Sequence, residues 1–301
     1  MPCTFRHLSP DELPALLDLC SAALPLDTFS WRLLERRIFE DPRYREDCAL
    51  GVEIDGRLAA ATVGVLRAMP EGHENGWIKL LAVHPSHRRQ GLATALLAEI
   101  EQRFRAAGAR QLDTVGAPHY LWPGVDVRYT PACLLLQRAG FTEHRYTVNM
   151  AVDLAAQTFD TVTEERELVR AGYTIHRADH AGLPALQAFI RKEWAAWCDE
   201  VAITLGNNPV SMFYATREGV PVAFAAYDTS MFSGTFGPMG TDASCRGKGV
   251  GAVLLKKCLR DMKGLGYPRC EIAWVGPVGF YARQVGAHIS RVFRDYRKPL
   301  T

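Results

Sequence analysis

The sequence has few of the features that mark membrane, secreted or nucleic-acid-binding proteins. No stretch of its 301 residues approaches the roughly 20 consecutive apolar residues of a membrane span. Its 35 lysines and arginines nearly balance 33 acidic residues, so a formal charge of +2 provides no chain-wide basic field for nucleic acid. The stretch from Met1 to His7 contains no apolar core of signal-peptide length. These absences predict a cytoplasmic protein that binds neither a membrane nor a nucleic acid.

Metal and disulfide patterns are also missing. The eight cysteines are scattered, with no Cys-x-x-Cys pair and no cysteine–histidine cluster at zinc spacing. His84 and His87 flank one turn, but no third ligand lies nearby in sequence. We therefore expect free thiols of a reducing compartment and no metal site.

The sequence does contain an internal repeat. Leu13–Leu17 recurs as Leu183–Gln187, and each follows a short strand-like run. Val52–Ala59 and Tyr214–Pro221 both read as a hairpin with an Asp-Gly or Glu-Gly turn. Similar segments in the same order predict two α/β units of one design.

Each half is predicted to run strand, one or two helices, three strands, a long helix, strand, helix and final strands. Apolar residues at helical spacing place the long helices at about 90–107 and 249–265. We expect one unit at 1–155, a connector at 156–169 and a second unit at 170–301. Each unit should hold a mixed, mostly antiparallel sheet flanked by helices.

The repeat includes a glycine-rich turn between an apolar strand and each long helix. The two copies are Arg88–Ala93 and Arg246–Gly251. Such a turn lacks side chains that would block a diphosphate, and it directs free N–H groups and the positive helix end toward an anion. A tightly packed helix start is the competing interpretation, and the arginine before both copies favours phosphate binding.

Strand, arginine–glycine turn and amphipathic helix together resemble the GNAT superfamily of N-acetyltransferases. Its most diagnostic segment has the pattern R/Q-x-x-G-x-G/A, and the likeness covers nearly the whole chain as two tandem units. No G-x-x-x-x-G-K-[ST] occurs, and no G-x-G-x-x-G follows the first strand of either unit, which disfavours nucleotide-binding folds.

The resemblance implies that acetyl-coenzyme A binds with its pyrophosphate on these turns and its pantetheine arm beside the preceding strand. In the first unit the implied residues are Leu81, Val83, Arg88, Arg89, Gln90, Gly91, Leu92 and Ala93. In the second they are Phe236, Pro238, Met239, Arg246, Gly247, Lys248, Gly249, Val250 and Gly251.

The resemblance also implies a tyrosine that protonates the departing thiolate. Tyr281 falls on the expected aromatic pair, although one extra residue separates it from Gly286. Leu136 occupies the corresponding place in the first unit and cannot give a proton. Tyr120 or Tyr129, in or just after the loop 118–126, are possible replacements. The second unit is therefore the expected catalyst, and the first a degenerate or regulatory copy. Whether the first unit still holds coenzyme A does not follow from the sequence.

The general base stays open among three carboxylates. Glu271 follows the second long helix, and Asp228 and Asp242 flank the strand before it. We favour Glu271, while Trp194, Trp197, Asp199 and Glu200 lie where relatives shape the acceptor pocket.

The sequence thus predicts an acetyl-coenzyme A-dependent N-acetyltransferase acting on a small primary amine by direct transfer. The alternative is a non-catalytic acyl-coenzyme A sensor or scaffold protein. The acceptor, the acyl length and the oligomeric state do not follow from the sequence.

Overall fold

The computed structural model describes residues 4–114, 121–229 and 232–300. The chain divides into two compact units, each described below by itself. Unit 1 comprises Met1–Thr147 and Val292–Thr301, and unit 2 comprises Val148–Arg291. This division differs from the boundaries expected from the sequence, because residues 148–155 lie in unit 2 and residues 292–301 lie in unit 1.

The sheet of unit 1 is mostly antiparallel. Its strands are β1 (Arg6–His7), β2 (Ala49–Ile54), β3 (Arg57–Ala68), β4 (Glu74–Val83), β5 (Ala109–Asp113), β6 (Val125–Asp126) and parts of β7 (Thr142–Asp153) and β13 (His288–Pro299). The β4–β5 pairing is parallel, whereas β3 pairs antiparallel with both β2 and β4. Asp55 and Gly56 form the β2–β3 turn at φ values of 51° and 73°, as the Asp-Gly signal predicts.

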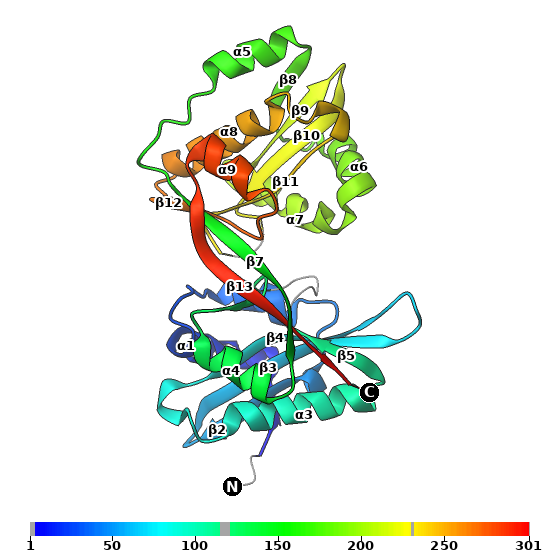
Figure 1. Cartoon of the computed structure of the whole chain (residues 1–301), viewed down its shortest axis with the longest axis vertical. Coiled ribbons are helices and arrows are strands. Elements are labelled where there is room, and N and C mark those ends of the chain that lie inside the picture. The colour runs from blue at the N-terminus through cyan, green and yellow to red at the C-terminus, as the bar shows by residue number, and fades with distance from the viewer. Residues whose placement is uncertain (1–3, 115–120, 230–231, 301) are drawn as a thin grey trace. The chain divides into compact units, whose positions relative to one another are not determined.

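Helices cover both faces of this sheet. They are η1 (Pro10–Glu12), α1 (Leu13–Ala23), α2 (Trp31–Leu34), η2 (Glu35–Phe39), η3 (Glu46–Cys48), η4 (Pro85–His87), α3 (Leu92–Ala106) and α4 (Thr130–Arg138). The apolar stripe of α3, with Leu96, Ile100 and Phe104, packs into one core with Leu136 of α4 and with β2, β3 and β4. Helix α1 contacts β3 and β4 from the other face (Figure 1).

Unit 2 repeats this order of elements. Its strands are β8 (Tyr173–Arg177), β9 (Met212–Arg217), β10 (Val220–Tyr227), β11 (Thr235–Thr241), β12 (Arg269–Ile272) and the remaining parts of β7 and β13. Its helices are α5 (Val162–Arg170), α6 (Leu183–Trp194), η5 (Ala195–Trp197), α7 (Cys198–Ile203), η6 (Thr204–Gly206), η7 (Ala243–Cys245), α8 (Val250–Gly264) and α9 (Val278–Val285). The expected Glu-Gly turn joins β9 and β10, with Glu218 and Gly219 at φ values of 53° and 77°.

Two separate apolar cores fix the faces of the second sheet. Helices α8 and α9 share one core with β10, β11 and β12, in which Leu254, Cys258 and Phe236 are fully buried. Helices α6 and α7 share the other with Phe224 and Met212. Side chains that alternate along each strand therefore point to an α8 face or to an α6 face.

The strands β7 and β13 explain why the units do not follow the order of the sequence. Residues 150–153 of β7 pair antiparallel with β12 in unit 2. Residues 297–299 of β13 pair antiparallel with β5 in unit 1, and residues 293–294 pair with β6. In Figure 1 the green β7 and the red β13 can each be followed from one unit into the other. Each sheet is thus completed by a strand that starts or ends in the other half of the sequence.

None of the helices in the described part of the chain is both long and apolar enough to cross a membrane.

Candidate functional site

In each unit one parallel strand pair separates partway along its length. The register of β4 and β5 ends at Trp77 and Asp113, although β4 continues to Val83. The register of β11 and β12 ends at Phe236 and Ile272, although β11 continues to Thr241. An irregularity in the preceding pairing occurs at the same point, with Lys79 extra on β4 and Gly237 and Pro238 opposite Ala226.

Beyond the last parallel pair, β4 and β11 each direct backbone N–H groups toward the side from which the neighbouring strand has separated. His84 N donates to Ala59 O on β3, so by alternation the N–H groups of Leu81 and Val83 point away from β3. Asp242 N donates to Val222 O on β10, so the N–H groups of Met239 and Thr241 point away from β10. These two pairs of donors face the side from which β5 and β12 have diverged.

Two of the residues implied by the resemblance do not add donors here. The backbone of Phe236 takes part in the pairing with Tyr227 and Ile272, and Pro238 has no N–H group. Thr241 was missed by the sequence reasoning. The repeat offset that relates Arg88 to Arg246 also relates Val83 to Thr241, and this signal could have identified it.

The two glycine-rich turns have nearly the same backbone. Gly91 and Gly249, the residues before α3 and α8, have φ values of 84° and 82°. Two residues earlier, Arg89 and Gly247 have φ values of 65° and 75°, so the left-handed position is kept even where the side chain is arginine. This agreement shows that both arginine–glycine segments form the same local structure.

Both helices begin without a side-chain cap. Within the described part of the chain, neither α3 nor α8 has a side-chain cap hydrogen bond, and neither first turn contains an acidic residue. A Cβ atom added at Gly91, Gly247 or Gly249 would meet nothing within 4 Å. Unpaired N–H groups at a positive helix end, next to open space, fit the diphosphate of coenzyme A.

The first arginine of each turn supports the loop itself. Arg88 Nε donates to Val83 O at 3.3 Å, and Arg246 Nε donates to Thr241 O at 3.1 Å. Arg88 Nη2 also donates to Ala23 O at the end of α1, at 2.9 Å. Both arginines remain exposed, as do Arg89, Gln90 and Lys248. They join the turn to the strand end and leave positive charge at the surface of the cradle.

Tyr281 lies in the core of unit 2 on the α8 face. Only 6 % of it is exposed, and its ring meets Phe236 and Phe280 edge to face at centroid distances of 6.2 Å and 5.1 Å. Phe280 Cζ is 4.0 Å from the Cβ position of Gly251 in the cradle. Burial is the main cause that raises the pKa of the Tyr281 phenol, so the phenol stays protonated.

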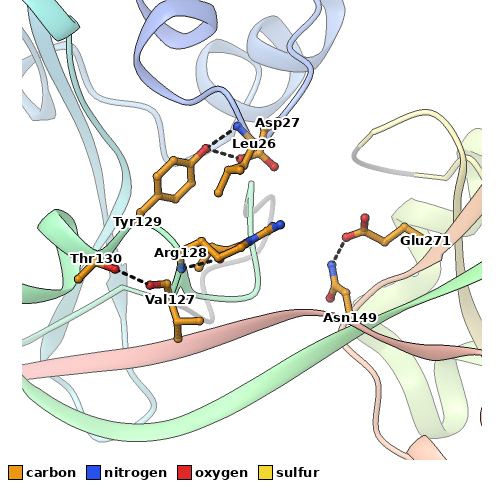
Figure 2. Close-up of polar contacts among 9 residues, drawn as sticks. Leu26, Asp27, Val127, Arg128, Tyr129, Thr130, Asn149 and Glu271 are labelled. Atoms are coloured by element: carbon orange, nitrogen blue, oxygen red, sulfur yellow. Dashed lines mark hydrogen bonds and ion pairs between the residues drawn. The ribbon is translucent and has the colours of Figure 1, made fainter.

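The first unit has no tyrosine in the matching helix. Leu136 is buried on α4 in the α3 core. Tyr129, just before α4, accepts from Leu26 N and donates to Asp27 Oδ2, both at 3.1 Å, so its hydroxyl is directed to the loop after α1 (Figure 2). Tyr120 lies outside the described residues.

The three candidate bases have different surroundings. Glu271 is partly exposed, and its Oε1 accepts a hydrogen bond from Asn149 Nδ2 at 2.5 Å (Figure 2). Asp228 accepts from Gly234 N and from the Tyr267 hydroxyl. Asp242 accepts from Ser244 N and caps η7.

Tyr281 and Glu271 lie on opposite faces of the diverging strands. Cys270 and Ile272, on either side of Glu271, belong to the core that contains Tyr281. Glu271 therefore points to the α6 face. The phenol of Tyr281 and the carboxylate of Glu271 therefore face opposite sides of the sheet.

Aromatic side chains border the α6 face of β11. Trp194 and Trp197 stack with their planes 7° apart and their centroids 6.0 Å apart. A Cβ at Gly240 of β11 would lie 2.9 Å from Trp194, so this indole lies directly on the strand. Both tryptophans are partly exposed, whereas Asp199 is exposed on α7.

Comparison with known proteins agrees with this architecture. The family model described as the acetyltransferase (GNAT) family matches residues 14–141 and 172–287. A mycothiol acetyltransferase of Kineococcus radiotolerans is 30% identical over 220 residues, which cover 70% of this chain and 67% of that protein.

Two solved structures have the same fold across the whole chain. A tandem GNAT protein from the clavulanic acid biosynthesis pathway superimposes with a TM-score of 0.70 at 17% identity, covering 100% of this chain and 99% of that one. The glucosamine N-acetyltransferase region of a fungal β-N-acetylglucosaminidase gives a TM-score of 0.77 at 17% identity over 99% of this chain. That protein is longer, and this chain spans 38% of it. With its family model matched in both halves, the chain belongs to the acetyltransferase (GNAT) family.

Proposed function

We propose that the protein transfers an acetyl group from acetyl-coenzyme A to a small primary amine, and that unit 2 carries out the chemistry. The observation that supports this most strongly is the combination in unit 2 of an uncapped helix start, a free pair of strand N–H groups and Tyr281. The amine class and the choice of unit rest on this combination and on the family.

The cradle of unit 2 would hold the diphosphate through the N–H groups at Gly249, Val250 and Gly251. A Cβ at Gly251 would lie 3.2 Å from Thr241 Oγ1 and 3.3 Å from Met239 Cε, so the helix start lies against β11. The N–H groups of Met239 and Thr241 are then available to an extended pantetheine arm and to the thioester oxygen. When bound, acetyl-coenzyme A supplies an activated acetyl thioester.

The remaining residues handle protons on the two faces. Glu271, oriented by Asn149, accepts a proton from the incoming ammonium on the α6 face. Tyr281, kept neutral by burial, holds the proton that the departing sulfur needs on the α8 face. The partly exposed indoles of Trp194 and Trp197 provide a flat apolar wall for the acceptor.

Replacing Tyr281 tests this assignment. With acetyl-coenzyme A and a panel of small primary amines, free-thiol release should identify at least one acceptor. Tyr281→Phe should then lower kcat by about 10²-fold because only the proton donor is lost, while calorimetry shows nearly unchanged affinity for coenzyme A.

Tyr227→Phe is the matched control. Tyr227 is equally buried in the same core, and its hydroxyl donates to Asp261 on α8 at 3.2 Å. The Tyr227→Phe variant should keep the wild-type kcat. Equal kcat values for the two variants would remove Tyr281 from the mechanism, and coenzyme A binding without thiol release for any amine would favour the sensor function.

A further inference from the structure

The two units carry different residues at one matching position of their sheets. Asp113 on β5 and Glu271 on β12 stand at or next to the last parallel pair before the strands separate. Their antiparallel neighbours are Arg297 on β13 and Ala151 on β7. Two residues before these neighbours come Asp295 in unit 1 and Asn149 in unit 2. The acid–amide pair of unit 2 therefore corresponds to an acid–acid pair in unit 1.

The amide in unit 2 has partners at both ends. Asn149 Nδ2 donates to Glu271, and Asn149 Oδ1 accepts from Trp274 N at 2.9 Å. Asn149 is 4 % exposed, so each polar atom of this buried side chain has a hydrogen-bond partner.

In unit 1, by contrast, one carboxylate oxygen of Asp295 lacks such a partner. Asp295 is 3 % exposed, and its buried Oδ1 has no hydrogen-bond partner among the residues that the structure describes. Its Oδ2 accepts from Arg145 Nε of β7 at 3.2 Å. A buried carboxylate oxygen without a donor lowers the free energy of unfolding. A bound ligand or a proton on the carboxyl would explain why such an oxygen is present.

The charges around Asp295 come from three neighbouring strands. Burial, and next the negative charge of Asp113, raise the pKa of the Asp295 carboxyl, whereas Arg145 and His144 of β7 oppose this shift. Asp113 itself accepts from Arg297 Nε at 2.8 Å and from Gln111 Nε2 at 2.5 Å. On β6, Asp126 forms an ion pair with Arg128 at 2.7 Å.

Asp295 and Asp113 face away from the α3 cradle. The neighbouring Tyr296 is fully buried in the core that contains α3. Asp295 therefore points to the α1 face, as Glu271 of unit 2 points to the α6 face. In both units these carboxylates lie opposite the cradle, on the side where an acceptor would enter.

We propose that unit 1 is a second acetyl-transfer site, in which Asp295, delivered by the C-terminal strand, accepts the proton of a primary ammonium held between Asp295 and Asp113. This inference rests on the proposed function, because acetyl-coenzyme A in the unit 1 cradle is the donor. The neutral amine forms a C–N bond with the acetyl carbonyl carbon, and the C–S bond breaks. Asp295 takes the ammonium proton, and the nitrogen gives its second proton to water as the amide forms. The departing thiolate takes a proton from water because Leu136 replaces the tyrosine.

The first experiment isolates unit 1. Gly249→Val places a side chain in the unit 2 cradle, and calorimetry should then show one coenzyme A site per chain. We expect slow residual thiol release with the best amine of the panel. Adding Asp295→Asn should lower this release by at least about tenfold, and Asp295→Glu should restore part of it. The rise of the residual kcat/KM with pH should shift or vanish in Asp295→Asn.

A second readout does not depend on activity. Because the folded pKa of Asp295 is raised, its negative charge destabilises the protein increasingly as the pH rises through that value. Asp295→Asn should therefore raise the melting temperature near pH 7, and the gain should shrink toward pH 4. Asn149→Asp is the reciprocal variant: it creates the acid pair in unit 2 and should lower the melting temperature near neutral pH.

Each outcome decides the proposal. If one coenzyme A binds to the Gly249→Val variant but no thiol is released, or release is indifferent to Asp295→Asn, unit 1 is not a transfer site. A melting temperature lowered by Asp295→Asn at every pH would make the residue a structural partner of Arg145 and overturn the proposal. If the wild-type chain binds no coenzyme A at all, the proposed function itself fails, which calorimetry distinguishes from the other outcomes.

Discussion

At the scale of single residues, a buried ion pair of unit 1 lies at the irregularity of β4. Lys79 is the extra residue there, and its ammonium donates to Arg37 O and forms an ion pair with Asp41. Their side chains are 1% and 0% exposed. Burial lowers the pKa of Lys79 to about 8 despite the attraction of Asp41. The pair ties the segment after α2 to the point where β4 leaves β5.

Breaking this pair from one side should destabilise the protein. Lys79→Met leaves Asp41 buried without a counterion and should cost roughly 3 kcal/mol of unfolding free energy, measured by urea denaturation. The double variant Lys79→Met/Asp41→Leu should recover most of this loss because both charges are gone. A double variant as unstable as the single one would show that Asp41 has other essential partners.

The same lysine predicts a pH dependence. Its folded pKa of about 8 lies below the ordinary lysine pKa of 10.5, so between these values the unfolded chain binds more protons. The contribution of Lys79 to stability therefore increases as the pH rises from about 8 to about 10.5. Comparing urea midpoints of the wild type and the double variant at pH 7 and pH 9.5 checks the sign. A wild-type advantage that falls over this interval would contradict it.

At the scale of elements, the last strand decides the integrity of the first unit. Phe293 and Tyr296 of β13 are fully buried, Leu300 is 5 % exposed, and Arg297 pairs with Asp113. Removing buried aromatic side chains costs roughly 3–5 kcal/mol each, which together approaches the whole stability of a typical domain.

A chain that ends at Arg291 should therefore lose unit 1, although its missing residues are at the opposite end of the sequence. Limited proteolysis with mass spectrometry should show cleavage throughout residues 4–114 and protection of α8 and α9. A chain that lacks only Thr301 is the control and should resist like the wild type. Protection of unit 1 in the shortened chain would show that β13 is dispensable for that sheet.

Local features of the fold and the site were predictable, and long-range ones were not. The turns at Gly91 and Gly249 and the hairpin at Asp55 follow from residues within a few positions of each other, so their signals survive in the sequence. The exchange of β7 and β13 depends on pairing partners far away in sequence. Alternating polar and apolar residues predict a strand but do not indicate which strand it pairs with. Asp295 could not be identified for this reason, because it stands on β13, whose residues 297–299 pair with β5 from the other half of the sequence.

At the scale of the whole molecule, the two cradles predict the binding stoichiometry. Their backbones agree closely at Gly91 and Gly249, and both helix starts lack a cap. Calorimetry should therefore detect two coenzyme A molecules per chain. Gly91→Val and Gly249→Val each put a β-branched residue at a left-handed position, at a cost of roughly 1–2 kcal/mol, and fill the open space beside the helix start.

Each glycine variant should reduce the stoichiometry to one, and the double variant should bind none. Gly72→Val is a suitable control, because Gly72 also has a positive φ of 80° and open space but belongs to the β3–β4 turn. A wild-type stoichiometry of one would mean that one of the two uncapped helices does not bind the cofactor.

The exchanged strands have a genetic consequence. The same connectivity would result if two identical subunits exchanged their final strands and were then fused into one chain. In the fused chain the linker keeps the two halves together, so their pairing does not depend on protein concentration. Asn149, encoded in the first half of the gene, orients the acid of unit 2, and Asp295, encoded near its end, belongs to unit 1. Recombination between two related genes at the midpoint would therefore not transfer one intact unit. Each unit of the recombinant protein would contain a strand from the other parent.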